Sequence, residues 1–259
     1  MIAAAICGIL IGAALGLLGG GGSILAVPAL VYGVGEPVAQ AVTTSLFVVG
    51  VTSAVGAVPR ARVSQVRWPI AGIFGAAGVA TAFGGTAVNN LMSGRALLFA
   101  FAALMIVVAA RMLAGEVTPR GSCASPDGRV NWARCVPKSA SAGVVVGFLT
   151  GLFGVGGGFV IVPALALLLG LEMPMAIGTS LVIIVINSAA GFAAHATRTS
   201  VDWPIALVFA GVSLVIAAVA GHFGAGVDPD RLRRWFAWLV IAVAVFVAIE
   251  AGVNPSALG

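Results

Sequence analysis

Two glycine-rich segments hold the residues with the clearest chemical potential. Residues 15–31 read LGLLGGGGSILAVPALV, and residues 150–166 read TGLFGVGGGFVIVPALA. Glycine has no Cβ, so such a segment tolerates irregular backbone and leaves N–H groups exposed where the next helix begins. The positive end of that helix can hold an oxyanion without a full positive charge.

We therefore predict that these segments bind a small anionic substrate. The simpler interpretation is tight packing, because small residues let membrane helices approach closely. The glycines are contiguous, occur twice and precede a short segment with a proline, which favours binding. The candidate residues are Gly19, Gly20, Gly21, Gly22 and Ser23 in the first segment, and Gly154, Gly156, Gly157 and Gly158 in the second.

Two pairs of hydroxyl-bearing residues form a second candidate group. Thr44 and Ser45 fall near the start of one predicted helix, and Thr179 and Ser180 near the start of another. Their hydroxyls can donate to an anion, or they can simply cap the helix. About two turns further along, polar residues continue on a similar face, which is expected to face the interior of a helix bundle. They are Thr52, Ser53, Ser188 and Asn187, and Asn187 is included in the predicted substrate site.

The two candidate groups belong to a duplicated unit. A shift of about 135 residues aligns both halves without a gap over most of their length. It places Thr44 on Thr179 and Trp68 on Trp203, and one departure is Ser23, which falls on Gly158. A duplicated apolar unit that glycines interrupt at matching positions is typical of transporters whose binding site lies between inverted repeats.

Composition places this unit in a membrane. The chain is 61% hydrophobic and 8% charged, with a mean hydropathy of +1.16. Soluble domains carry about 25% charged residues, so this chain cannot build a water-facing surface. The net charge of +5 is no sign of nucleic-acid binding, because the basic residues sit in a few connecting loops. The first 18 residues or so lack a basic n-region and a cleavage site, and are expected to belong to the fold.

Apolar runs predict an all-α integral membrane protein with two inverted-topology repeats. Each repeat has a Gly-broken helical hairpin, re-entrant or spanning, followed by three transmembrane helices. The first repeat is residues 1–113, the second is 140–259, and 114–139 form a central polar loop. The expected helical segments are 2–18, 24–34, 41–58, 68–90 and 96–113, then 140–153, 159–170, 176–196, 203–222 and 233–252.

Loop charge predicts the orientation of these repeats. Basic residues cluster in a loop at 59–67, in the central loop and before the last helix. Placing all three in the cytoplasm gives the two halves opposite topology, with both termini facing outward. The loops that hold Glu36 and Glu172 have no Lys or Arg.

Few residues suggest metal or cofactor chemistry. Cys123 and Cys135 have no His in their loop, so they make a poor zinc site. A loop disulfide is expected if the loop faces an oxidising space, and free thiols if it is cytoplasmic. No carboxylate is expected at the bilayer midplane, which disfavours a cation pump and favours anions or neutral solutes. No metal and no cofactor are predicted.

The paired blocks GLLGGGGS-x-L-x-V-P-A-L and GLFGVGGGF-x-x-V-P-A-L, each followed by T-S-L and then W-P, resemble the sulfite exporter TauE/SafE family. The resemblance covers nearly the whole chain. It implies a permease of the bacterial plasma membrane that moves sulfite, sulfoacetate or related sulfur-containing anions. The inverted duplication favours a secondary transporter that works by alternating access between its two halves. The resemblance also implies that the glycines and hydroxyl pairs named above form the site.

Three alternatives stay open at this point. An anion channel could use the same glycine tips, and a membrane scaffold would need no flux at all. An intramembrane serine hydrolase would use Ser23 with His195 or His222 as base, but the serine is not duplicated while the glycines are. Expected partners are the small anion and membrane lipid, without nucleic acid; homo-oligomerisation is left open.

Overall fold

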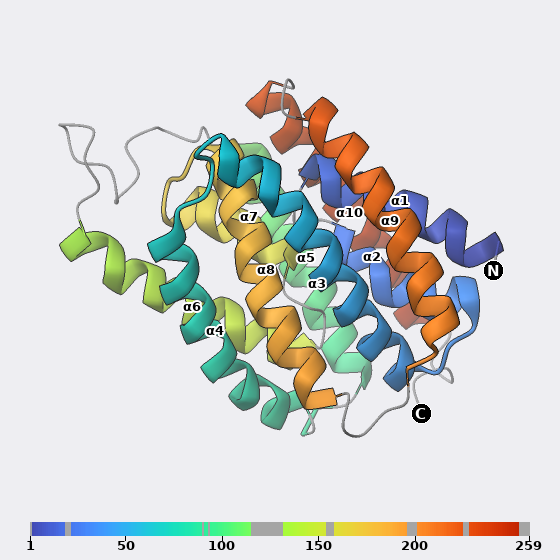
Figure 1. The fold of residues 1–259 in the computed structure, drawn as a ribbon. Helices are drawn as coiled ribbons and strands as arrows, with labels where there is room; N and C mark the ends of the chain where they lie inside the picture. Colours follow the sequence, from blue (N-terminus) through green and yellow to red (C-terminus); the bar gives the residue numbers. More distant parts are fainter. Residues whose placement is uncertain are drawn as a thin grey trace.

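The protein is a bundle of helices (Figure 1). The computed structural model describes residues 2–18, 22–89, 91–92, 94–114, 132–153, 158–195, 201–224 and 228–253. Within those ranges the regular structure is entirely helical, as predicted. The first half contains α1 (Ile2–Leu18), α2 (Ser23–Pro28), the π-helical η2 (Ala29–Val34), α3 (Val38–Arg62), α4 (Trp68–Asn89) and α5 (Gly94–Ala114). The second half contains α6 (Trp132–Phe153), α7 (Gly158–Pro163), the π-helical η3 (Ala164–Leu168), α8 (Met173–His195), α9 (Trp203–Gly224) and α10 (Pro229–Val253).

Five of these helices are long and apolar enough to cross a membrane. They lie within α3, α4, α6, α8 and α9, as segments of 19 to 23 residues. A bilayer's hydrocarbon core needs about 20 residues of helix. Large apolar side chains on outward faces, such as Leu207 at 60% exposure and Val107 at 57%, suit contact with lipid. The prediction of a multi-pass helical membrane protein is confirmed.

Helices of one half pack mainly against helices of the other. α1 lies beside α9 and α6 lies beside α4, while α3 pairs with α8 and α5 with α10. Exchanging the two halves leaves this pattern unchanged, because α1 and α9 correspond in the repeat to α6 and α4. The duplication in the sequence is therefore also a pseudo-symmetry of the packing.

Glycines allow two of these helix pairs to approach closely. A Cβ added at Gly12 of α1 would lie 2.5 Å from the Ser213 carbonyl oxygen of α9, and one added at Gly16 would lie 2.5 Å from that of Ala217. In the second half, a Cβ at Gly147 would meet the Gly78 carbonyl of α4. Backbone carbonyls cannot move aside easily, so these positions require glycine for helix contact.

α3 and α8 cross at the centre and run in opposite directions (Figure 1). Leu46 near the start of α3 contacts Gly191 near the end of α8, at 3.2 Å from an added Cβ. The equivalent pair, Leu181 and Gly56, is in contact at 3.6 Å at the other end of the crossing. Equivalent residues of α3 and α8 therefore lie at opposite ends of the molecule.

These two ends differ in charge. We call the end where α3 begins, with Glu36 and Asp202, the acidic end, and the end where α3 finishes, with Arg60, the basic end. α4, α6, α8 and α10 begin at the basic end, and α1, α3 and α9 begin at the acidic end (Figure 1).

Some element boundaries differ from the prediction. α3 continues through Pro59 for one more turn, so Arg60 and Arg62 lie on a helix and not in a loop as expected. Proline removes only its own N–H, and the Pro59 and Arg60 carbonyls still accept from Val63 and Gln65. α6 begins at Trp132, so residues 132–139 of the predicted polar loop are helical.

Cys135 is a second difference. It is buried in the first turns of α6 and is disulfide-bonded, whereas a free thiol was expected for a cytoplasmic loop. The expectation rested on the redox state of the compartment, which does not determine whether two cysteines are near each other.

Candidate functional site

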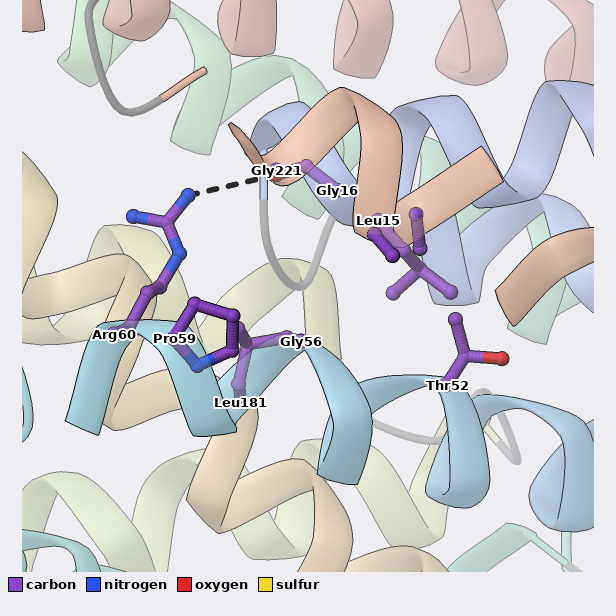
Figure 2. A pocket seen from close by; sticks show the side chains of 10 residues that line it. Leu15, Gly16, Thr52, Gly56, Pro59, Arg60, Leu181 and Gly221 are labelled. Carbon is purple, nitrogen blue, oxygen red and sulfur yellow. Dashed lines mark hydrogen bonds between the residues drawn. The ribbon is translucent and has the colours of Figure 1, made fainter. Parts of the chain in front are cut away.

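A small pocket lies between the two halves at the basic end (Figure 2). Its volume is about 20 Å³, a little more than one water molecule requires. An anion such as sulfite would therefore need the surrounding helices to separate slightly. The pocket is lined by Leu15, Gly16, Thr52, Gly56, Pro59, Arg60, Leu181, Ala217, Ala218 and Gly221.

Arg60 is the charged residue of this pocket, and it is buried, with 7% of its surface exposed. Its guanidinium donates to the Gly16 carbonyl oxygen at 3.4 Å (Figure 2). It also donates to Oε1 of Gln65 at 3.4 Å. Among the described residues, no carboxylate pairs with it. A buried charge is costly unless it is paired, and two long hydrogen bonds leave most of its five N–H donors available.

Two roles fit this arrangement. The bond to Gly16 caps carbonyl groups near the end of α1, where a cation is favourable. The remaining donors can hold an oxyanion in the forked geometry that guanidinium offers. The first role accounts for the bond that the structure shows, and the second would bring a negative charge to a pocket whose lining contains no acid.

The sequence reasoning missed Arg60 because it treated the residue as a loop charge that sets orientation. Two signals were available. An arginine directly after an apolar run is in reach of the preceding helix, and in the repeat register Arg60 falls on another basic residue, His195. The side chain of His195 is outside the described set.

Hydroxyls line the middle of the α3–α8 crossing. Thr52 faces the pocket and donates to the Val48 carbonyl at 2.7 Å. Ser53 and Ser188 are buried, and neither hydroxyl has a hydrogen-bond partner among the described residues. Asn187, the counterpart of Thr52, instead faces Gly78 of α4, and its Oδ1 has no partner there. The polar residues thus face the interior of the bundle. Thr52 on α3 faces the pocket near α1 and α9, whereas Asn187 on α8 faces α4.

The structure does not bring the two Thr-Ser pairs together. Thr44 lies at the acidic end of α3, whereas Thr179 lies at the basic end, where its hydroxyl accepts from the Arg67 N–H at 3.1 Å. Ser45 and Ser180 donate at 2.8 Å to carbonyls three residues earlier in their own helices. Thr44 is buried and its oxygen has no partner among the described residues.

Most of the predicted glycine ligands lie outside the described residues, namely Gly19, Gly20, Gly21, Gly154, Gly156 and Gly157. Gly22 and Gly158 are buried at the starts of α2 and α7, two short helices that contact each other. A Cβ on Gly22 would lie 2.5 Å from Cγ of Leu15, so packing against α1 explains this glycine. Ser23 is buried and is not without an interaction partner.

Comparison with known proteins assigns the chain to a family. The profile of the sulfite exporter TauE/SafE family matches residues 4–247. The chain belongs to this family. A protein of Xylella fastidiosa (strain Temecula1) named "Probable membrane transporter protein" is 36% identical over 246 residues, covering 92% of this chain and 91% of the relative.

More distant relatives match about half of this TauE/SafE protein. "Probable membrane transporter protein MJ0441" of Methanocaldococcus jannaschii is 31% identical over 119 residues, covering 44% of this chain and 45% of the relative. "Probable membrane transporter protein YunE" of Bacillus subtilis is 34% identical over 116 residues, covering 43% and 41%. No solved structure matches the chain.

Family membership makes this TauE/SafE protein a membrane transporter and not an enzyme. The serine-hydrolase alternative is therefore dropped, and so is a scaffold without flux. Within the described part of the chain, no three His, Cys, Asp or Glu residues are grouped so that they could hold a metal ion.

Proposed function

We propose that this protein is a secondary transporter that exports small sulfur-containing anions, such as sulfite or organosulfonates, across the plasma membrane by alternating access. The observation that carries the proposal is Arg60. It is a buried guanidinium without a carboxylate partner in the described structure, in a pocket lined by both halves of the chain. Thr52, Ser53 and Ser188 continue the polar path from that pocket along the crossing, whereas Asn187 faces α4.

The antiparallel crossing supports inverted topology. If α3 and α8 both span the bilayer, a two-fold axis that relates them lies in the membrane plane, as in transporters built from inverted repeats. The first Gly-broken hairpin then enters and leaves on the side of the acidic end. α1 begins there, beside the start of α9, and the chain returns there after η2, where Glu36 lies near Asp202. The second hairpin would do the same on the opposite side. Rocking of the α1–α9 pair against α3 would open or close the pocket.

Charge supports one orientation. Arg60, Arg62 and Arg67, the last turn of α5 with Arg111, and the first turns of α6 and α10 all lie at the basic end. We place this end in the cytoplasm, with both termini outside. The Arg60 pocket then faces the compartment from which an exported anion enters. An inside-negative potential favours outward movement of an anion by about 2.3 kcal/mol per charge per 100 mV.

Thermal unfolding of the detergent-purified protein tests the binding site. We would screen sulfite, sulfate, thiosulfate, sulfoacetate, taurine and simple carboxylates for a rise in Tm. Selective stabilisation by a sulfur anion that disappears in Arg60→Gln supports the proposal. Arg62→Gln is the matched control, because Arg62 is exposed on the same helical turn. Folded protein that responds to none of these anions would point to another class of solute.

A further inference from the structure

A buried carboxyl group lies at the acidic end, apart from the Arg60 pocket. Glu36 is 6% exposed, and neither carboxylate oxygen has a hydrogen-bond partner among the described residues. Its backbone is firmly placed: Gly35 has a φ of +82°, which favours glycine, and the Glu36 N–H donates to the Leu30 carbonyl at 3.1 Å.

The repeat shows that the fold does not require an acid here. In the second half Gly170 has a φ of +68°, and the following Leu171 N–H donates to the Leu165 carbonyl, also at 3.1 Å. Leu171 is buried at 8% exposure, in the position that Glu36 occupies in the first half. An aliphatic side chain thus suffices, and an unpaired buried carboxylate costs free energy, so Glu36 needs a reason other than packing.

Among the residues that the structure describes, none near Glu36 is a cation. The Thr44 hydroxyl lies beside it from α3, outside hydrogen-bond geometry, and the exposed Asp202 faces it from the start of α9. Asp202 also caps α9 by accepting from the Ile205 N–H at 3.3 Å. α1, α2 and η2, which pack around this turn, contain no Asp, Glu, His, Lys or Arg. The basic residues of α3 lie at its opposite end, with Arg60 about 33 Å from Val38 along the helix.

Such an environment favours the protonated carboxyl. Burial raises the pKa of Glu36 above its ordinary 4.5, the Thr44 hydroxyl opposes this, and the negative charge of Asp202 adds to it. A metal cation fits less well, because hard cations take six or more oxygen ligands and the described groups here supply few.

We propose that Glu36 is a proton-binding site that couples proton movement to anion transport; this rests on the transport function proposed above. An ionised Glu36 repels an anion at this end of the pathway, whereas the protonated carboxyl is neutral and can donate a hydrogen bond. Coupling requires that Glu36 takes its proton from the cytoplasmic side before the anion passes and releases it outside afterwards. The anion and the proton then move in the same direction. A dianion that moves with one proton keeps a net negative charge, so the membrane potential still favours its export.

Proton movement in proteoliposomes tests this coupling. Vesicles would be loaded with sulfoacetate and a pH-sensitive dye between about pH 6 and 8, where this anion keeps a constant charge. We expect sulfoacetate efflux from wild-type vesicles to make the interior more alkaline. In Glu36→Gln, the rate of exchange of labelled for unlabelled sulfoacetate should stay within severalfold of the wild-type rate. The rate of proton movement should fall at least tenfold below that of wild type. Glu172→Gln, which removes an exposed acid before α8, should behave like wild type.

The outcomes separate the two proposals. Wild-type vesicles without sulfoacetate exchange would contradict the transport function itself for this anion. Exchange without proton movement, or proton movement that persists in Glu36→Gln, would overturn the coupling while leaving transport intact. If Glu36→Gln does not fold, Glu36→Leu replaces it, because the repeat accommodates leucine at this position.

Discussion

The Arg60 guanidinium donates a hydrogen bond to the Gly16 carbonyl oxygen, 3.4 Å away and 44 residues earlier in the chain. This bond joins the last turn of α3 to the last turns of α1, the first helix of the Gly-broken hairpin. Movement of the hairpin would therefore change the surroundings of the buried charge. Arg60 would then take part both in binding the anion and in the conformational change of the hairpin.

Arg60 provides the first prediction. Arg60→Gln keeps donors for the Gly16 carbonyl but removes the charge, and a hydrogen bond to a charged group contributes about 1.5–3 kcal/mol. We expect sulfur-anion flux in proteoliposomes to fall by about tenfold or more, and Arg60→Lys to restore part of it. Arg62→Gln should stay within about twofold of wild type. Equal losses in both variants would mean that net charge matters and not the buried site.

Helix packing provides the second prediction. Gly12→Ala places a Cβ 2.5 Å from the Ser213 carbonyl oxygen, so α1 and α9 must separate, at a cost of about 1–3 kcal/mol. Gly72→Ala on α4 has no neighbouring atom within 4 Å and should be neutral or stabilising by up to about 1 kcal/mol. Thermal unfolding in detergent measures both changes. A Gly12→Ala protein as stable as Gly72→Ala would show that the α1–α9 contact is looser than described.

The two equivalent threonines should respond differently to valine. Thr179→Val removes the acceptor of the Arg67 N–H and should lower the free energy of unfolding by about 1 kcal/mol. Thr44→Val removes a hydroxyl that lies beside Glu36 without meeting hydrogen-bond geometry, so it should lower the free energy of unfolding by less than Thr179→Val does. Equilibrium or thermal unfolding gives the order of stability. The reverse order would argue against the bond pattern at the two helix starts.

Glu36 makes stability depend on pH. Because its folded-state pKa is raised above 4.5, the folded protein binds this proton more tightly than the unfolded chain. Stability therefore falls as pH rises from about 4.5 through the raised pKa, and is lowest above it. The difference in Tm between Glu36→Gln and wild type should grow in favour of the variant over that range. Parallel curves for the two proteins would show that Glu36 titrates normally.

Orientation can be tested with single cysteines in a background without the native ones. Ser64→Cys lies in the exposed turn after α3 at the basic end, and Pro37→Cys is exposed at the acidic end. A membrane-impermeant maleimide should label Pro37→Cys in intact cells, and Ser64→Cys only in inverted vesicles. The opposite labelling would place the basic end outside, an oxidising location that would also suit the disulfide at Cys135.

Much of the architecture could be predicted from local pattern. Runs of apolar residues predicted the helix order, and the repeat of glycines and of Trp-Pro predicted two related halves. These features are readable because membrane insertion and backbone hydrogen bonding act on each segment separately. Helix ends near proline were less predictable, as the extra turn of α3 after Pro59 shows, because the turn depends on what the following residues contact.

The chain's sequence by itself determined its membrane class, its duplication and its family. Only the tertiary structure decided which polar residues share a site. The antiparallel crossing of α3 and α8 separates Thr44 from Thr179, and packing of α1 and α9 against α3 buries Arg60. Burial of Glu36 depends likewise on the turn between η2 and α3. The equivalent residue of the second half is Leu171, which is also buried, so the fold itself does not require a charge at this position. The physical reason is that periodicity records which face of a helix is apolar, whereas the surroundings of a charge depend on helices contributed by the other half.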